Sequence, residues 1–339
     1  MPDPGLQASI ALRESVTGRI VQDDRRRGEE TKLRFWGEGA TILMIGAMAA
    51  LAHRTGIVFL LFPELAALAY GVFLQAGERW AEVPGRLFLT PFLTAVIGVL
   101  LVRSLGDGLI SSFLSVGLSL VIIRLLRSPV SPAISAGLLP LVLKDGNWQY
   151  PAAVGVGTGL LAILLLLRRI VPSGRLPEGA GVAVIREEER LWESGGFLFF
   201  LGFFGLFLAF SDMAGGRMML VPPLVVAGYE LFSRSRDCPW ASRPIALVTC
   251  CVLVACVGVA GCITLGKGAL AAVVTMAAGM TVFRGLGLAL PPALAIGLLP
   301  FFLDSPGWSY PAAVGAGAGI LSLLALVYRR YGHWGEASR

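Results

Sequence analysis

Two stretches of the chain, 160 residues apart, nearly repeat each other and decide its architecture. The first reads Gly137-Leu-Leu-Pro-Leu-Val-Leu-Lys-Asp-Gly-Asn-Trp-Gln-Tyr-Pro-Ala-Ala-Val-Gly155, and the second reads Gly297-Leu-Leu-Pro-Phe-Phe-Leu-Asp-Ser-Pro-Gly-Trp-Ser-Tyr-Pro-Ala-Ala-Val-Gly315. Carried backwards, the same offset pairs Pro132 with Pro292, Arg124 with Arg284 and Trp80 with Trp240. An offset held over this length indicates an internal duplication.

The composition around these stretches is typical of a membrane protein. Hydrophobic residues make up 55% of the chain and charged residues 15%, and the mean hydropathy is +0.75. Most charges lie in the first 36 residues, between Arg168 and Arg190, and in the last 11 residues. The windows between them are nearly free of charge over the length that a helix needs to cross a bilayer. The lipid bilayer is therefore the expected surrounding of this chain.

Each copy contains six apolar segments. They span 39–53, 56–75, 87–103, 107–126, 131–143 and 149–167 in the first copy, and 196–211, 217–233, 245–263, 267–286, 290–303 and 309–328 in the second. We predict an all-α polytopic membrane protein with two parallel repeats of about six segments each, of which four to six cross the membrane. Parallel repeats follow because an even number of crossings returns the chain to the same side.

Arginines between the segments predict the orientation, because basic loops stay in the cytoplasm. We expect a cell inner (plasma) membrane protein with both termini cytoplasmic. The predicted parts are a polar N-terminal extension (1–36), a first membrane repeat (37–169), a cytoplasmic linker (170–191), a second repeat (192–330) and a cytoplasmic tail (331–339).

Prolines interrupt the second and fifth segments of each copy. A proline removes a helical hydrogen bond, and interrupted segments at matching places in two halves indicate a polar site near the midplane. A half-helix that begins near Pro132 or Pro292 presents backbone N–H groups and its positive dipole end to a small anion. The predicted substrate-binding residues are Pro63, Tyr70, Pro132, Ser135, Pro222, Tyr229, Pro291 and Pro292. The alternative is that these segments are kinked, packed helices without a ligand.

Three charged residues have both a functional and a structural interpretation. Glu64 lies within an apolar segment, where a carboxylate needs a partner or a proton, so it is a candidate for proton coupling or a residue that reaches the interface. Arg124 and Arg284 stand at the ends of the fourth segments. They are interpreted either as pore-mouth charges that attract anions or as topology signals. Trp148, Tyr150, Trp308 and Tyr310 are interpreted as aromatic residues at the membrane interface.

The sequence argues against several other functions. It has two histidines, and its five cysteines lie without ligand-like spacing in the second half, so we expect no metal and no cofactor. No pairing of nucleophile and base is visible, so an enzyme is not expected. The net charge of +6 flanks apolar segments instead of forming a basic stripe, which argues against nucleic acid.

Part of each copy resembles a known family. The run Leu290-Pro-Pro-Ala-Leu-Ala-Ile-Gly-Leu-Leu-Pro300, followed by Trp308-x-Tyr-Pro, is similar to the signature of the HPP family of small membrane proteins. Leu290 and Val130 stand where that signature has histidine. The resemblance implies a tandem duplication of an HPP-like module, a fold that usually has four crossings. Some members of the family are linked to nitrite transport.

Two functions follow as hypotheses. The first is a transporter or facilitator of a small, nitrite-like anion, with a site formed by the proline-broken segments between the two repeats. The alternative is a structural or assembly subunit of a larger membrane complex that transports nothing. The sequence leaves open whether the chain forms a homo-oligomer or joins a larger assembly.

Overall fold

The computed structural model describes residues 32, 34–74, 83–170, 196–213, 220–233 and 238–331. The described residues contain helices and no strands. The first helix spans Arg34–Thr55. Its first three residues belong to the predicted polar extension. Most of that extension, residues 171–191 of the predicted linker, and residues 332–339 of the predicted tail lie outside the described part of the chain.

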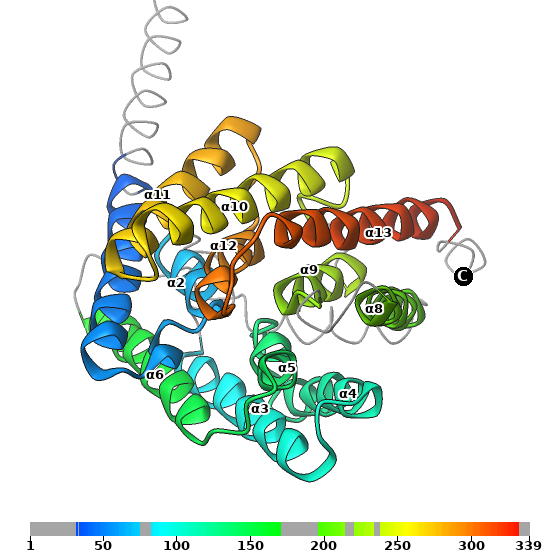
Figure 1. The fold of residues 1–339 in the computed structure, drawn as a ribbon, viewed down its shortest axis with the longest axis horizontal. Helices are drawn as coiled ribbons and strands as arrows, with labels where there is room; N and C mark the ends of the chain where they lie inside the picture. Colours follow the sequence, from blue (N-terminus) through cyan, green and yellow to red (C-terminus); the bar gives the residue numbers. More distant parts are fainter. Residues whose placement is uncertain are drawn as a thin grey trace, which may run out of the picture.

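Four short helices form the centre of the molecule (Figure 1). They are α2 (Glu64–Leu74), α5 (Ala133–Leu143), α9 (Pro222–Ser233) and α12 (Pro291–Leu298), the last continued by the 3-10 turn η4 (Leu299–Phe302). Helix α2 packs on α12, α12 packs on α9, and α9 packs on α5. Nearly all their residues are buried, as expected of helices that are apolar on every side.

Longer helices surround this centre. They are the helix Arg34–Thr55, α3 (Pro84–Leu105), α4 (Leu109–Leu125), α6 (Gln149–Ile170), α8 (Gly196–Met213), α10 (Pro244–Leu265), α11 (Ala269–Leu286) and α13 (Ser309–Tyr331). Seven of them are long and apolar enough to cross a membrane. Their outer surfaces expose large apolar side chains, Ile110 and Ile245 among them. This is a multi-pass membrane protein.

The helix ends gather at two faces of the molecule. At the first, face A, Arg86 at the start of α3 donates a hydrogen bond of 2.7 Å to the carbonyl of Arg127 after α4. At the second, face B, Arg103 at the end of α3 donates one of 3.2 Å to the carbonyl of Gly146, between α5 and α6. The segment that contains α5 therefore runs from face A to face B alongside α3. In the other half, Arg243 and Lys267 make the corresponding contacts with the carbonyls of Gly287 and Leu303.

The second segment also runs between the two faces. The 3-10 turn η1 (Val58–Leu61) lies at face B, where the ring of Phe59 meets Tyr150 at the start of α6, with centroids 5.4 Å apart. The far end of α2 lies at face A, where an added Cβ on Gly37 would be 2.7 Å from the carbonyl oxygen of Phe73. A helix of 11 residues is about 17 Å long, so η1 and the turn after it cover the rest of this distance.

Two tyrosines repair hydrogen bonds that prolines remove. Pro140 in α5 has no N–H for the carbonyl four residues back, which is that of Ala136. The Tyr150 hydroxyl donates to this carbonyl at 2.8 Å. In the other half, Tyr310 donates to the carbonyl of Ile296, four residues before Pro300, at 2.7 Å. Both tyrosines are buried, so the prediction that they are interfacial aromatic residues is wrong; Trp148 and Trp308 are exposed.

Glycines set the distance between the long helices and the short ones. A Cβ added to Gly98 of α3 would be 2.2 Å from the carbonyl oxygen of Gly137 in α5. A Cβ added to Gly258 of α10 would be 2.1 Å from the carbonyl oxygen of Gly297 in α12. Each crossing therefore brings two backbones into contact, and the helix axes approach as closely as glycine allows.

The two halves contact each other reciprocally. The second segment of each half packs on the fifth of the other, α2 on α12 and α9 on α5. Phe113 of α4 meets Phe204 of α8 with centroids 5.0 Å apart, while Gly46 of the first helix lies against Val273 of α11. Helices α3 and α10 begin and end at positions that are 160 residues apart.

Candidate functional site

The predicted prolines stand at the starts of the four short helices. Pro63 directly precedes α2, Pro132 caps α5, Pro222 begins α9, and Pro291 and Pro292 begin α12; all are buried. Proline fits such positions because its missing N–H would have no helical partner there and its φ is already helical. The prolines therefore fix where each short helix begins.

The backbone at the start of α5 differs from the sequence prediction. The N–H groups of Ala133, Ile134 and Ala136 donate to the carbonyls of the preceding turn, at 3.0–3.2 Å. They are not available to an anion. The polar groups that the start of α5 offers are side chains, and these belong to serines.

Glu64 is the first residue of α2 and is 1% exposed. The hydroxyl of Ser135, in the first turn of α5, donates to its Oε1. Its Oε2 is buried and has no partner. A carboxyl group in apolar surroundings needs a cation, donors or a proton. The structure thus brings together two of the predicted residues, Glu64 and Ser135, and leaves one carboxyl oxygen unbonded by the protein.

A second buried carboxyl group comes from the other half. Glu230, near the end of α9, is 6% exposed, and the hydroxyl of Ser131 donates to its Oε1. Ser131 lies in the turn before α5, and Ser135 lies in the first turn of the helix. The start of the fifth segment thus bonds two carboxyl groups, one from each half.

The predicted tyrosines are buried against aromatic rings. Tyr70 of α2 meets Phe283 of α11 edge-on, with centroids 5.5 Å apart. Tyr229 of α9 meets Phe200 of α8 in the same geometry at 5.8 Å. Each of these contacts is made near face A, toward the end of a short helix, so the two tyrosines contribute to the packing of the short helices against the long ones.

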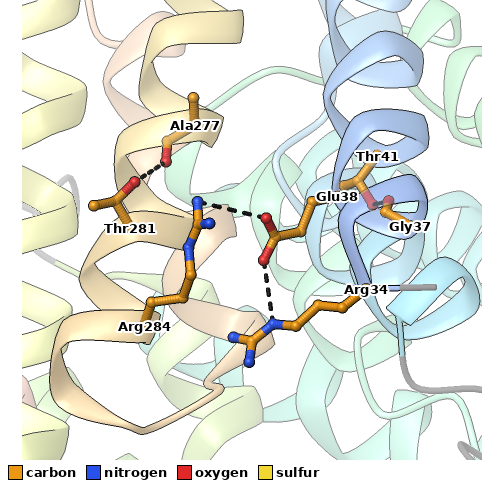
Figure 2. A network of polar contacts seen from close by, with 7 residues as sticks. All are labelled: Arg34, Gly37, Glu38, Thr41, Ala277, Thr281 and Arg284. Carbon is orange, nitrogen blue, oxygen red and sulfur yellow. Dashed lines mark hydrogen bonds and ion pairs between the residues drawn. The ribbon is translucent and has the colours of Figure 1, made fainter. Parts of the chain in front are cut away.

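The predicted pore-mouth arginines lie at face A, and both are exposed. Figure 2 shows Arg284 reaching across from α11 to the carboxylate of Glu38 on the first helix, which also meets Arg34. The N–O distances are 3.5 Å from Arg284 and 3.3 Å from Arg34. Arg284 thus links the two halves through an ion pair. Its role at a pore mouth stays a prediction, as does that of Arg124.

Sequence reasoning missed Ser131, Glu230 and a set of buried hydroxyls on α3 and α4. Glu230 lies near the end of an apolar segment, and its burial depends on the helices that pack on α9, which are distant in the sequence. The hydroxyls did leave a signal. Ser111, Ser115 and Ser119 recur every four residues in a mainly apolar helix, which places them on one face.

The side chains that could bind a metal ion are dispersed in the described part of the chain. Among the described residues, no three His, Cys, Asp or Glu side chains come together as a metal site would require. The side chains of Cys250, Cys251 and Cys262 form no disulfide and are buried on α10, as small apolar residues would be.

Comparison with known proteins adds no family to this description. No family model, no curated protein sequence and no solved structure matches the chain.

Proposed function

We propose that this chain is a secondary transporter of a small anion and that it moves a proton together with its substrate. The observation that carries the proposal is the pair of buried carboxyl groups, Glu64 and Glu230, each bonded to a serine at the start of α5. Ionisable groups inside a membrane protein are costly and mark ion pathways or proton relays.

Protonation reconciles the carboxyl groups with an anionic substrate. Two carboxylates would repel an anion, because like charges interact strongly where the dielectric constant is low. A protonated carboxyl group is neutral and can donate to the oxygen of its serine, which frees the hydroxyl proton of Ser131 or Ser135 to donate to the anion. We therefore expect the anion to enter only with a proton, and nitrite remains the first candidate because of the HPP resemblance.

The architecture that we propose is a tandem pair of parallel HPP-like modules in the inner membrane, with face A in the cytoplasm. The matching bounds of α3 and α10 and the reciprocal contacts of the short helices support it. Six crossings in each half agree with the alternating helix directions, if the second and fifth segments cross as short helices extended by turns. Centrally placed short helices are also what many transporters use to form a midplane site.

The test is uptake of nitrite and other small monovalent anions into proteoliposomes, compared with empty liposomes, under an imposed pH gradient. With one proton per anion, each pH unit should support about tenfold accumulation. Glu64→Gln keeps the shape of the side chain but cannot be ionised, so it should abolish the dependence on the gradient. Glu38→Gln, at the edge of face A, serves as the matched control and should keep that dependence.

Two results would contradict the proposal. If the unmodified protein shows saturable uptake that does not depend on the pH gradient, transport is not coupled to a proton. An absence of uptake for every anion, with folded and inserted protein, would leave the structural subunit as the better description, and co-purification of stoichiometric partners would then be the observation to seek.

A further inference from the structure

Buried hydroxyl groups are distributed unequally between the two halves. Helices α3 to α6 and their connections contain ten buried serines and threonines, namely Thr90, Thr94, Ser111, Ser112, Ser115, Ser119, Ser128, Ser131, Ser135 and Thr158. The corresponding region of the second half, α10 to α13, contains two, Thr275 and Ser322. Both regions are described without gaps, so the comparison covers equal lengths of chain.

Position by position, the second half replaces these hydroxyls with apolar side chains or glycine. The residues 160 positions later are Cys250, Val254, Ala271, Ala272, Thr275, Gly279, Leu288, Pro291, Ala295 and Ala318. Only Thr275 keeps a hydroxyl. Because the second half forms helices with the same order and nearly the same bounds, this architecture does not need the hydroxyls. Polar groups that folding does not require, and that cost free energy to bury, indicate a function.

Some of these hydroxyls have a local explanation. Thr94, Ser112 and Thr158 donate to carbonyls three or four residues back in their own helices or at the helix start, a common way to satisfy a buried hydroxyl. The others either connect different elements or lack a partner. Thr90 donates to Ser128 at 2.7 Å, and Ser115 donates to the carbonyl of Gly137 at 2.7 Å.

The remaining hydroxyls follow one another through the first half. Thr90 and Ser128 lie near face A, where α3 begins and α4 ends. Ser131 with Glu230 comes next along α5, followed by Ser135 with Glu64. Ser115 and Ser119 lie at the level of Gly137, where α3 crosses α5. Ser111 lies at the start of α4, toward face B.

Two buried polar atoms in this series have hydrogen-bonding capacity that no residue uses. They are the Oγ of Ser119 and the Oε2 of Glu64. Two further unbonded atoms, the Nε1 of Trp240 and the Oγ1 of Thr275, lie in the second half. Nearly all buried polar groups in proteins have partners. In the first half both exceptions lie beside α5, since Ser119 is next to Gly137 and Glu64 is bonded to Ser135, and this arrangement points to a ligand that passes between them.

We propose that the path of the transported anion and its proton lies within the first half, between α2, α3, α4 and α5. Neutral hydroxyl donors line this path, Glu64 carries the proton, and the second half contributes its scaffold and the carboxyl group of Glu230. The charged or titratable groups that face Glu64 from neighbouring elements are the hydroxyls of Tyr150 and Tyr310, both of which donate to carbonyls. This inference rests on the proposed transport function.

Transport by matched variants gives the first test. Ser135→Ala installs the residue that the second half has at that position, and Ser119→Ala removes the unbonded hydroxyl. Each should lower nitrite uptake at least about tenfold, the equivalent of losing one hydrogen bond to the passing ion. Thr275→Val removes a buried hydroxyl that also has no partner, but from the second half, and should leave uptake within about twofold.

Water access gives a second test that does not depend on transport. In a variant with all five cysteines replaced by alanine, single cysteines are placed at Ser115 and Ser119, and at their counterparts Thr275 and Gly279. A small charged methanethiosulfonate reagent should modify the two first-half positions and spare the two second-half positions. A fluorescence-detected size-exclusion profile of each variant checks that it is folded.

The two tests separate the failure of this inference from the failure of the proposed function. If the reagent modifies only the first-half cysteines and no anion is taken up, the path stands and anion transport is rejected. Uptake that falls equally with Thr275→Val, or modification that is equal in both halves or absent from the first, would overturn the one-sided path while transport stands.

Discussion

At the scale of single residues, the clearest design is the pairing of a tyrosine with a proline. Tyr150 and Tyr310 each bond the carbonyl that a proline has deprived of its helical donor. In hydrocarbon no water is present to donate a hydrogen bond to such a carbonyl. Each tyrosine is therefore needed because a proline is present in a neighbouring helix. This explains why the tyrosine and the proline occur together in both halves.

This pairing predicts a coupled pair of substitutions. Tyr150→Phe leaves the Ala136 carbonyl without a donor and should lower the free energy of unfolding by about 1 kcal/mol, the usual scale of a buried hydrogen bond. Pro140→Ala restores the backbone N–H, so Tyr150→Phe should cost much less in that background. Thermal unfolding in detergent, run as a double-mutant cycle, measures the difference. Additive effects would show that the two residues act separately.

At the scale of helices, the glycine crossings decide how closely the long and short elements pack. Gly98→Ala would place a methyl group 2.2 Å from the carbonyl oxygen of Gly137, a severe steric clash with a backbone atom that cannot rotate away. We expect the free energy of unfolding to fall by at least about 2 kcal/mol, with Gly258→Ala behaving alike. Gly117, on α4, has open space around its Cβ position, and Gly117→Ala should be neutral or mildly stabilising. Equal melting temperatures for Gly98→Ala and Gly117→Ala would refute the close contact.

Sequence reasoning succeeded best where one segment determines its own structure. The fifth segments were placed at 131–143 and 290–303, and α5 and α12 with η4 occupy 133–143 and 291–302, because prolines and apolar runs act locally. The surroundings of a side chain depend on distant elements. The partnership of Ser131 with Glu230 joins residues of different halves, and a pattern within one segment contains no information about it.

At the scale of the whole molecule, the contacts at faces A and B define an orientation that labelling can check. In a cysteine-free background, Lys144→Cys and Asp304→Cys place thiols at face B, one in each half, and Arg127→Cys places one at face A. If the halves are parallel and face A is cytoplasmic, an impermeant maleimide should label the first two in intact cells and the third only after permeabilisation. Labelling of only one of the two face B positions would indicate halves of opposite orientation.

The reciprocal packing of the short helices has a consequence for how the protein is made. When the ribosome has finished α6, helix α2 has been synthesised but its neighbour α12 begins only at residue 291, and α5 still lacks α9. Until the second half arrives, Glu64 and the serines of α5 have no finished core around them. The first half must therefore wait in an incomplete state during membrane insertion, and a gene cut between the halves would yield a working protein only if both pieces were produced together.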